Sequence, residues 1–229
     1  MKITMGAMMV MMIGAVAGDS NGVYSPCEDA KVQKSDGFTI GLAFSKKESF
    51  SFQNVQLSPC DSRLGLAKKG AKLAVFRPKV DEISLLTING NTTVSSFLEA
   101  GGYMVAFAGR KYAARSLPIM VADANYTITR FTLVMEFKQG TLQNLYWKSS
   151  GCDSCSGKSA TCLNKQDCAR PTPKCGQNGC SLGIQSAFSG TDKNLEVLNS
   201  WYEVSKLRQQ SLIDLYSDLR DKFFYEMTL

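Results

Sequence analysis

Six of the eight cysteines in this chain of 229 residues lie between Cys152 and Cys180, and this block limits what the chain can fold into. The block contains few large apolar side chains, so it cannot offset its chain entropy by burying a core of its own. Disulfide bonds or bound metal ions are the remaining means of stabilising the block in a single conformation. The block consists of Cys152, Cys155, Cys162, Cys168, Cys175 and Cys180.

The other two cysteines, Cys27 and Cys60, lie far from the block in the sequence. A disulfide between them would close a loop of about 34 residues and stabilise the fold by roughly 3.7 kcal/mol through the loss of chain entropy. We therefore predict that Cys27 pairs with Cys60. The remaining six pair within the block, where the sequence leaves the connectivity open.

The cysteine spacing also allows two other uses, a zinc site and a redox pair. The spacing of the first four cysteines of the block is compatible with a zinc site, and Cys152 and Cys155 form a C-x-x-C pair. The pair follows a predicted β-hairpin, however, whereas redox pairs of this kind begin a helix. The chain has no histidine, and an oxidising compartment favours disulfides over zinc. We predict four disulfides, no metal and no cofactor.

The amino terminus predicts an exported protein. Residues 3–17 are apolar except for Thr4 and end in Ala15-Val16-Ala17, a pattern typical of a signal peptide over residues 1–17. The apolar run is shorter than the roughly 20 residues that a membrane span needs. We therefore expect a secreted, extracellular protein without a transmembrane anchor. Cleavage removes one lysine and no acid, which lowers the net charge from +6 to +5.

Alternating hydrophobicity predicts that most of the mature chain is β-structure. We expect residues 18–229 to form a single domain that is mainly β, an antiparallel sandwich or barrel. In this interpretation residues 23–151 form the β body and residues 152–180 a disulfide-rich insert. Residues 181–229 form one further strand and a long C-terminal helix.

The sequence predicts the residue ranges and the burial of several strands. Large and small side chains alternate from Phe38 to Phe44, which predicts a half-buried strand, whereas Tyr103–Ala108 is apolar throughout and should be covered on both faces. Residues 131–137 and 142–147 should form a hairpin. A change of phase near Gln53-Asn54 suggests a β-bulge. Asp192 can cap a helix that runs to the end of the chain and packs on the sheet or binds a partner.

The absence of histidine excludes several kinds of catalysis. Ser-His-Asp and Cys-His sites and the usual zinc hydrolase centres all need that side chain. A pair of carboxylates, as in glycoside hydrolases, stays possible and gives the alternative function of an enzyme acting on wall polysaccharide. Its candidates in the β body are Asp81, Glu82, Asp123 and Glu136.

A cation-rich loop predicts a binding site. Arg110, Lys111 and Arg115 fall within six residues around Tyr112, and Trp147 ends a predicted strand. Arginine and lysine suit carboxylates, and an aromatic ring can stack on a sugar. For a secreted protein this favours acidic polysaccharide over nucleic acid as the partner. A partner protein in extracellular signalling is a further alternative.

Two sequons fit the secretory route. Asn91-Thr92-Thr93 and Asn125-Tyr126-Thr127 both match the acceptor pattern for N-linked glycans. Asn91 follows Asn89-Gly90, a strong turn signal, so it should lie at an exposed tip.

The chain resembles a plant family of small secreted proteins, some of which are labelled Expp, an expansin-like name. The resemblance rests on the cysteine block and on residues 76–88, 101–116 and 188–193, and it extends over nearly all of the mature chain. It implies a plant protein of the cell wall or cell surface and supplies no catalytic residues. Expansins themselves carry a histidine-containing motif that is missing here, so expansin activity is not implied.

Overall fold

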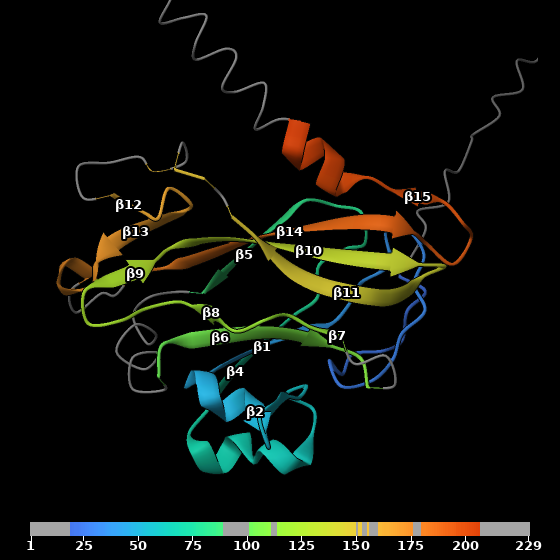
Figure 1. Cartoon of the computed structure of the whole chain (residues 1–229). Coiled ribbons are helices and arrows are strands. Elements are labelled where there is room, and N and C mark those ends of the chain that lie inside the picture. Colours follow the sequence, from blue (N-terminus) through green and yellow to red (C-terminus); the bar gives the residue numbers. More distant parts are fainter. Residues whose placement is uncertain are drawn as a thin grey trace, which may run out of the picture.

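The computed structural model describes residues 19–88, 101–110, 114–149, 151–152, 155, 160–175 and 180–206. Two five-stranded sheets form the body of the fold (Figure 1). The β1 sheet contains, in order, β4 (Lys72–Phe76), β1 (Ile40–Ser45), β6 (Tyr103–Ala108) and β7 (Ala114–Arg115), with β8 (Ile119–Met120) also beside β6. The β10 sheet contains β11 (Thr141–Lys148), β10 (Arg130–Lys138), β14 (Leu182–Thr191) and β15 (Val197–Leu198), with β5 (Ser84–Ile88) also beside β14.

The main core lies between these two sheets. Alternate residues of β1, such as Leu42 and Phe44, pack in one cluster with alternate residues of β10, such as Leu133 and Met135, and with Phe188 of β14. This arrangement confirms the prediction of a mainly β sandwich, and the sheets form no closed barrel. The predicted hairpin is also confirmed, because β10 and β11 pair in antiparallel register across Gln139-Gly140.

The outer face of the β1 sheet is also buried along β1 and β6, whereas Leu73 and Val75 of β4 are exposed there. Ala43 of β1 and Phe107 of β6 pack there in a second cluster with Phe50. The prediction that Tyr103–Ala108 is covered on both faces is confirmed, whereas β1 is fully buried rather than half-buried. The covering layer consists of η1 (Lys47–Phe50), β2 (Ser51–Phe52), β3 (Val55–Gln56), η2 (Ser62–Leu64) and η3 (Leu66–Lys69).

The predicted bulge near Gln53-Asn54 is a turn instead. Both residues have positive φ, 49° and 62°, and they join β2 to β3 as a two-residue hairpin. Such turns require left-handed backbone at both positions, which asparagine tolerates better than most residues. The change of hydrophobic phase therefore marks a reversal of the chain.

One pairing in the β10 sheet runs parallel. β10 and β14 align from Arg130 beside Gly183 to Phe137 beside Gly190, while the other described pairs are antiparallel. β14 thus lies between β10 on one side and β5 and β15 on the other. The sequence prediction of an antiparallel fold did not include this pair.

All eight cysteines are paired as predicted. Cys27 bonds to Cys60, and the three other disulfides, Cys152–Cys162, Cys155–Cys168 and Cys175–Cys180, lie within the block. The block surrounds a small sheet that contains β12 (Thr161–Leu163), β13 (Asp167–Pro171) and β9 (Tyr126–Ile128), followed by η5 (Thr172–Cys175). Because β13 of the block pairs with β9, and β9 leads directly into β10, this pairing fixes the block to one end of the β10 sheet.

The C-terminal helix begins later than predicted. Asp192 does not cap it, because its carboxylate accepts the backbone N–H groups of Asn194 and Glu196 and closes a turn in which Leu195 has φ 67°. The described helix spans residues 200–206, and the rest of the predicted long helix lies outside the described residues. Its first turn is capped by Asp81, whose Oδ1 accepts the N–H groups of Asn199 and Ser200.

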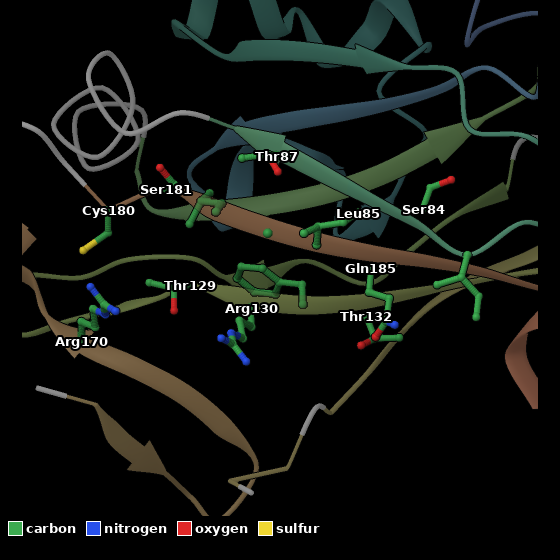
Figure 2. A pocket seen from close by; sticks show the side chains of 14 residues that line it. Ser84, Leu85, Thr87, Thr129, Arg130, Thr132, Arg170, Cys180, Ser181 and Gln185 are labelled. Atoms are coloured by element: carbon green, nitrogen blue, oxygen red, sulfur yellow. The ribbon is translucent and has the colours of Figure 1, made fainter. Parts of the chain in front are cut away.

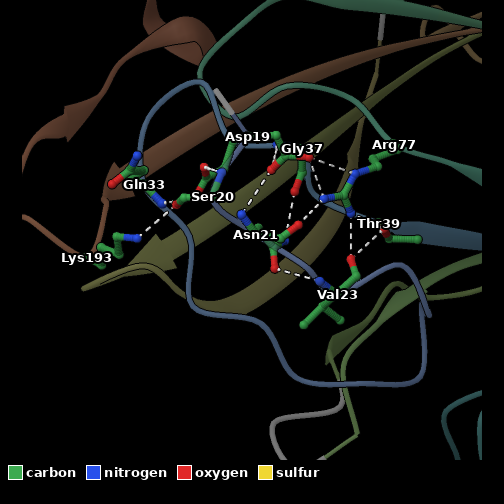
Figure 3. Close-up of polar contacts among 10 residues, drawn as sticks. Asp19, Ser20, Asn21, Val23, Gln33, Gly37, Thr39, Arg77 and Lys193 are labelled. Carbon is green, nitrogen blue, oxygen red and sulfur yellow. Dashed lines mark hydrogen bonds and ion pairs between the residues drawn. The ribbon is translucent and has the colours of Figure 1, made fainter. Parts of the chain in front are cut away.

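The segment directly after the predicted signal peptide is tied onto the fold (Figure 3). The guanidinium of Arg77 binds the carboxylate of Asp19 and donates to the backbone carbonyls of Asn21 and Val23. Asp19 also accepts the N–H of Gly37. The pKa of Asp19 is held below its ordinary value, because these donors outweigh the opposing effect of partial burial.

Candidate functional site

A groove of about 870 Å³ lies on the outer face of the β10 sheet (Figure 2). The side chains on its floor alternate with the residues that point into the main core. Phe131 and Leu133 of β10 face the core, so Arg130 and Thr132 lie on the opposite face. The groove is lined by Ile83, Ser84, Leu85, Thr87, Thr129, Arg130, Phe131, Thr132, Arg170, Cys180, Ser181, Leu182, Gly183 and Gln185.

Strand register arranges the floor of the groove in two rows. Arg130, Gly183 and Thr87 stand side by side on β10, β14 and β5. In the next row Thr132 and Leu85 flank Gln185. Gly183 has no side chain and therefore leaves the centre of the first row open; a Cβ there would be in van der Waals contact with Leu85 Cδ1 at 3.4 Å. The parallel pair therefore builds a floor with polar groups at both sides.

The cysteine block supplies one wall of the groove. Arg170 lies on β13, which pairs with β9 and is attached through Cys168 to Cys155. Cys180, which is bonded to Cys175, and Ser181 complete this wall. Figure 2 shows Arg170 and Arg130 along the same side of the groove. The disulfides thus hold one of its two arginines in place.

The chemistry of the lining suits an anionic, hydroxyl-rich ligand. Both ionisable side chains on the described lining are arginines, and its other polar side chains are hydroxyl-bearing residues and Gln185. Leu85 is 71% exposed and offers an apolar contact beside them. Arginine binds a carboxylate with two parallel hydrogen bonds, and hydroxyl side chains exchange hydrogen bonds with sugar hydroxyls. No Asp or Glu lies on the described lining.

The loop chosen from the sequence lies away from this groove, at the end of the β1 sheet. Arg110 is exposed, and its backbone N–H donates to Asp29 Oδ1. Arg115 donates through Nε and Nη2 to the carbonyl oxygen of Gln56, so part of its hydrogen-bonding capacity is used within the fold. Lys111 and Tyr112 lie outside the described residues. A site on this loop stays a prediction.

Trp147 is not part of that loop. It points toward the sandwich core, where its ring meets Phe131 edge-on with 5.8 Å between ring centroids. The strand-end tryptophan is half-buried, and its described contacts are those of a core residue.

The four candidate carboxylates stand at separate structural positions. Asp81 pairs with Lys34 at 2.8 Å besides capping the helix, and Glu82 pairs with Lys79 at 3.5 Å. Asp123 accepts the N–H groups of Asn125 and of Tyr126, the first residue of β9. Glu136 is exposed on the outer face of β10, where its charge and the burial of Tyr146 raise the pKa of that phenol, with burial the larger cause.

The two sequons lie in different parts of the chain. Asn91 lies outside the described residues. Asn125 is exposed in the turn before β9, while the hydroxyl of Thr127 is buried against Thr172 Oγ1 at 3.0 Å. Glycan attachment at either asparagine stays a prediction.

Sequence reasoning missed the groove because its floor depends on a long-range pairing. Nothing near Arg130 indicates that Gly183 will lie beside it, and Arg170 belongs to a segment whose composition indicated only disulfides. The available signals were the polar residues Arg130 and Thr132, which alternate with apolar ones on β10. They indicated which face is outward and did not indicate a site.

Fold and site together define a disulfide-bonded β-sandwich protein with a cation-lined groove on one outer face. Among the described residues, no helix has the length and apolar character needed to cross a membrane. The chain belongs to the family described as uncharacterised protein DDB_G0273449, whose model matches residues 1–127 and 122–228. No curated protein and no solved structure matches the chain. The resemblance to plant Expp proteins stays a prediction.

Proposed function

We propose that this protein is secreted and acts as a non-enzymatic binding module for acidic polysaccharide of a cell wall or cell surface. The observation that carries the proposal is the lining of the groove, in which Arg130 and Arg170 are accompanied by hydroxyl groups and by no described carboxylate. Four disulfides support an extracellular location, because such bonds persist in oxidising compartments.

The groove favours binding over catalysis. Glycoside hydrolysis needs two carboxyl groups facing each other across roughly 5–10 Å. Asp81 and Asp123 accept backbone hydrogen bonds within the fold, and Glu136 is exposed on the outer surface of the β10 sheet. A carboxylate-bearing sugar, by contrast, meets two guanidinium groups on separate strands, which gives both attraction and orientation.

The test is a polysaccharide array probed with the full mature chain at low and high salt. We expect polygalacturonate to bind and a neutral glucan to bind weakly. Arg130→Ala/Arg170→Ala should lower the affinity for polygalacturonate by about tenfold or more, since hydrogen bonds to charged groups are worth roughly 1.5–3 kcal/mol each. Raising the salt should weaken binding, because exposed charges are screened over about 8 Å at physiological ionic strength.

Two further variants locate the site. Thr87→Trp keeps every charge and fills the floor beside Gly183, so it should also abolish binding if the groove is used. Arg110→Ala/Lys111→Ala tests the cation-rich loop predicted from the sequence. It leaves Arg115 unchanged, because the side chain of Arg115 donates a hydrogen bond to the carbonyl oxygen of Gln56. If the loop variant alone loses binding, the site moves to the loop. If wild type ignores every anionic polymer, the proposed function is wrong.

A further inference from the structure

A second group of cations lies on the layer that covers the β1 sheet. We call Lys46, Lys47, Lys68 and Lys69 the basic surface. All four side chains are exposed, and none forms an ion pair within the described part of the chain. Lysines at such positions present unshared positive charge to the solvent.

Folding brings the two segments that carry these lysines into contact. Lys46 and Lys47 follow β1 and begin η1, whereas Lys68 and Lys69 end η3. η1 and η3 contact each other, and Phe50 of η1 packs with Leu66 of η3 over the outer face of the β1 sheet. The basic surface is therefore a product of the fold, and a reading of the sequence alone finds two separate lysine pairs.

Few acids oppose this charge. Glu48 is exposed beside Lys47, and Asp61 is the other acid between residues 46 and 70. Asp61 is already engaged, because Arg63 donates to both of its oxygens and lowers the pKa of that carboxyl to about 2. Within residues 46–70, four exposed lysines thus accompany one acid, Glu48, that forms no ion pair among the described residues, and this leaves an excess of positive charge in the two segments.

The basic surface and the groove lie on opposite sides of the sandwich. The layer with η1 and η3 covers the outer face of the β1 sheet, and the groove lies on the outer face of the β10 sheet. The main core, with Leu42 of one sheet and Leu133 of the other, lies between them. Figure 1 shows the layer beneath β1 and β6 and the β10 sheet on their other side.

We propose that the protein bridges two chains of acidic polysaccharide, one held in the groove and one on the basic surface. This inference rests on the proposed function and adds a cross-linking role to it. In the groove, the guanidinium groups of the arginines bind the carboxylates of one polysaccharide chain with paired hydrogen bonds. On the basic surface, the ammonium groups of several lysines attract the second polysaccharide chain electrostatically. Binding at the basic surface is weaker alone and gains strength when many proteins act on the same pair of polymers.

The experiment measures bridging separately from binding, with polygalacturonate as the probe. Turbidity of the polymer is followed while wild-type protein is added, and the affinity of the groove is measured by calorimetry on a short oligomer. For wild type we expect turbidity to rise, pass through a maximum and fall when excess protein saturates each chain separately. Sedimentation of the protein alone establishes whether it is a monomer.

Lys47→Gln/Lys68→Gln/Lys69→Gln should abolish turbidity while the affinity for the short oligomer stays within about twofold of wild type, because the groove is distant and unchanged. The matched control Lys31→Gln/Lys138→Gln/Lys206→Gln removes the same charge from exposed positions elsewhere and should leave turbidity intact. Arg130→Ala/Arg170→Ala should lose both turbidity and oligomer binding.

Other outcomes overturn the inference in distinguishable ways. If wild type binds the oligomer and never raises turbidity, bridging is wrong and the proposed function stands. If the lysine variant bridges as well as wild type, the basic surface has no such role and self-association explains the turbidity. If wild type binds no polygalacturonate, the proposed function itself fails.

A separate experiment uses vesicles of phosphatidylserine and phosphatidylcholine. Lysine-dependent binding to these vesicles, without bridging of polygalacturonate, would assign the basic surface to membranes.

Discussion

Asp192 is a buried carboxylate that joins distant parts of the chain. It accepts the backbone N–H of Lys34, 158 residues away, as well as those of Asn194 and Glu196. Burial alone would raise the pKa of Asp192, but these three donors more than compensate and hold it below its ordinary value. The ionised form is therefore the one that stabilises the fold.

The first prediction concerns acid and Asp192. Because its folded-state pKa lies below the unfolded value of about 4, its stabilisation is fully present above that pH and is lost as the pH falls through the folded pKa. Asp192→Asn should lower the free energy of unfolding by about 1–3 kcal/mol at pH 7 and make stability less sensitive to acid. Urea unfolding from pH 7 to pH 3 measures both effects, and an unchanged acid dependence would contradict the assignment.

Gly41 shows how a missing side chain permits close pairing of two strands. It lies opposite Phe107 in the pairing of β1 with β6, and a Cβ on Gly41 would overlap the Phe107 ring. Phe107 fills the second cluster on that face, so its ring cannot move aside without disturbing Phe50.

The second prediction follows from this contact. Gly41→Ala should lower the free energy of unfolding by about 1–3 kcal/mol, the usual cost of overpacking. Gly22→Ala is the matched control, because a Cβ there has nothing within 4 Å. Thermal unfolding of both variants is the measurement. Equal melting temperatures would show that the β1 sheet accommodates the extra methyl group, and the proposed tight contact would be wrong.

At the scale of elements, the C-terminal helix depends on a residue far from it in sequence. Asp81, whose side chain is 1% exposed, accepts two N–H groups at the start of the helix and pairs with Lys34. Its backbone has φ 66°, a conformation that aspartate tolerates better than most residues. The cap therefore joins the segment before β5 to the end of the described chain.

The third prediction compares neighbouring acids. Asp81→Ala should cost about 2 kcal/mol, because it removes the cap and leaves a left-handed backbone position to alanine. Glu82→Ala should change the stability by less than about 0.5 kcal/mol, since its pair with Lys79 is exposed. Far-ultraviolet circular dichroism with urea titration compares the two. A large loss with Glu82→Ala, or none with Asp81→Ala, would contradict the assignment of the cap.

Elements defined by local pattern were predictable, and pairings between distant elements were not. The β10–β11 hairpin and the buried β6 follow from side-chain periodicity and a turn within one short stretch. The parallel contact of β10 with β14 joins residues with no local signal for each other, and the groove depends on that contact. Asp192 is a third case: the sequence predicted that it caps the C-terminal helix, but its carboxylate closes the turn at residues 192–196 instead.

At the scale of the whole molecule, two of the disulfides have different roles, one in the stability of the fold and the other in the structure of the groove. Cys27–Cys60 closes a loop with a sequence separation of 33 and lies in the cluster on the outer face of the β1 sheet. Cys175–Cys180 has a sequence separation of 5 and borders the groove. The first should matter more for global stability and the second for binding.

The fourth prediction states this contrast. Cys27→Ser/Cys60→Ser should lower the free energy of unfolding by about 3.7 kcal/mol and Cys175→Ser/Cys180→Ser by about 2.2 kcal/mol, from the entropy of the loops alone. Polygalacturonate affinity should fall in the second variant and stay near wild type in the first, measured under conditions where both remain folded. The reverse pattern would show that the block does not shape the groove.

The position of β14 within the β10 sheet determines when the protein can fold. This strand lies between β5 and β10 in the sheet, yet it consists of residues 182–191, near the end of the described chain. Neither β5 nor β10 can form its pairing with β14 until most of the chain has been synthesised. If the chain is exported during synthesis, as the proposed secretion implies, it would pass through the membrane channel with its sheet incomplete and complete the sheet only on the far side. Folding chaperones and disulfide-forming enzymes would meet an open molecule whose earliest achievable link is Cys27–Cys60, because both sulfurs precede the groove, the block and the strand that closes the sheet.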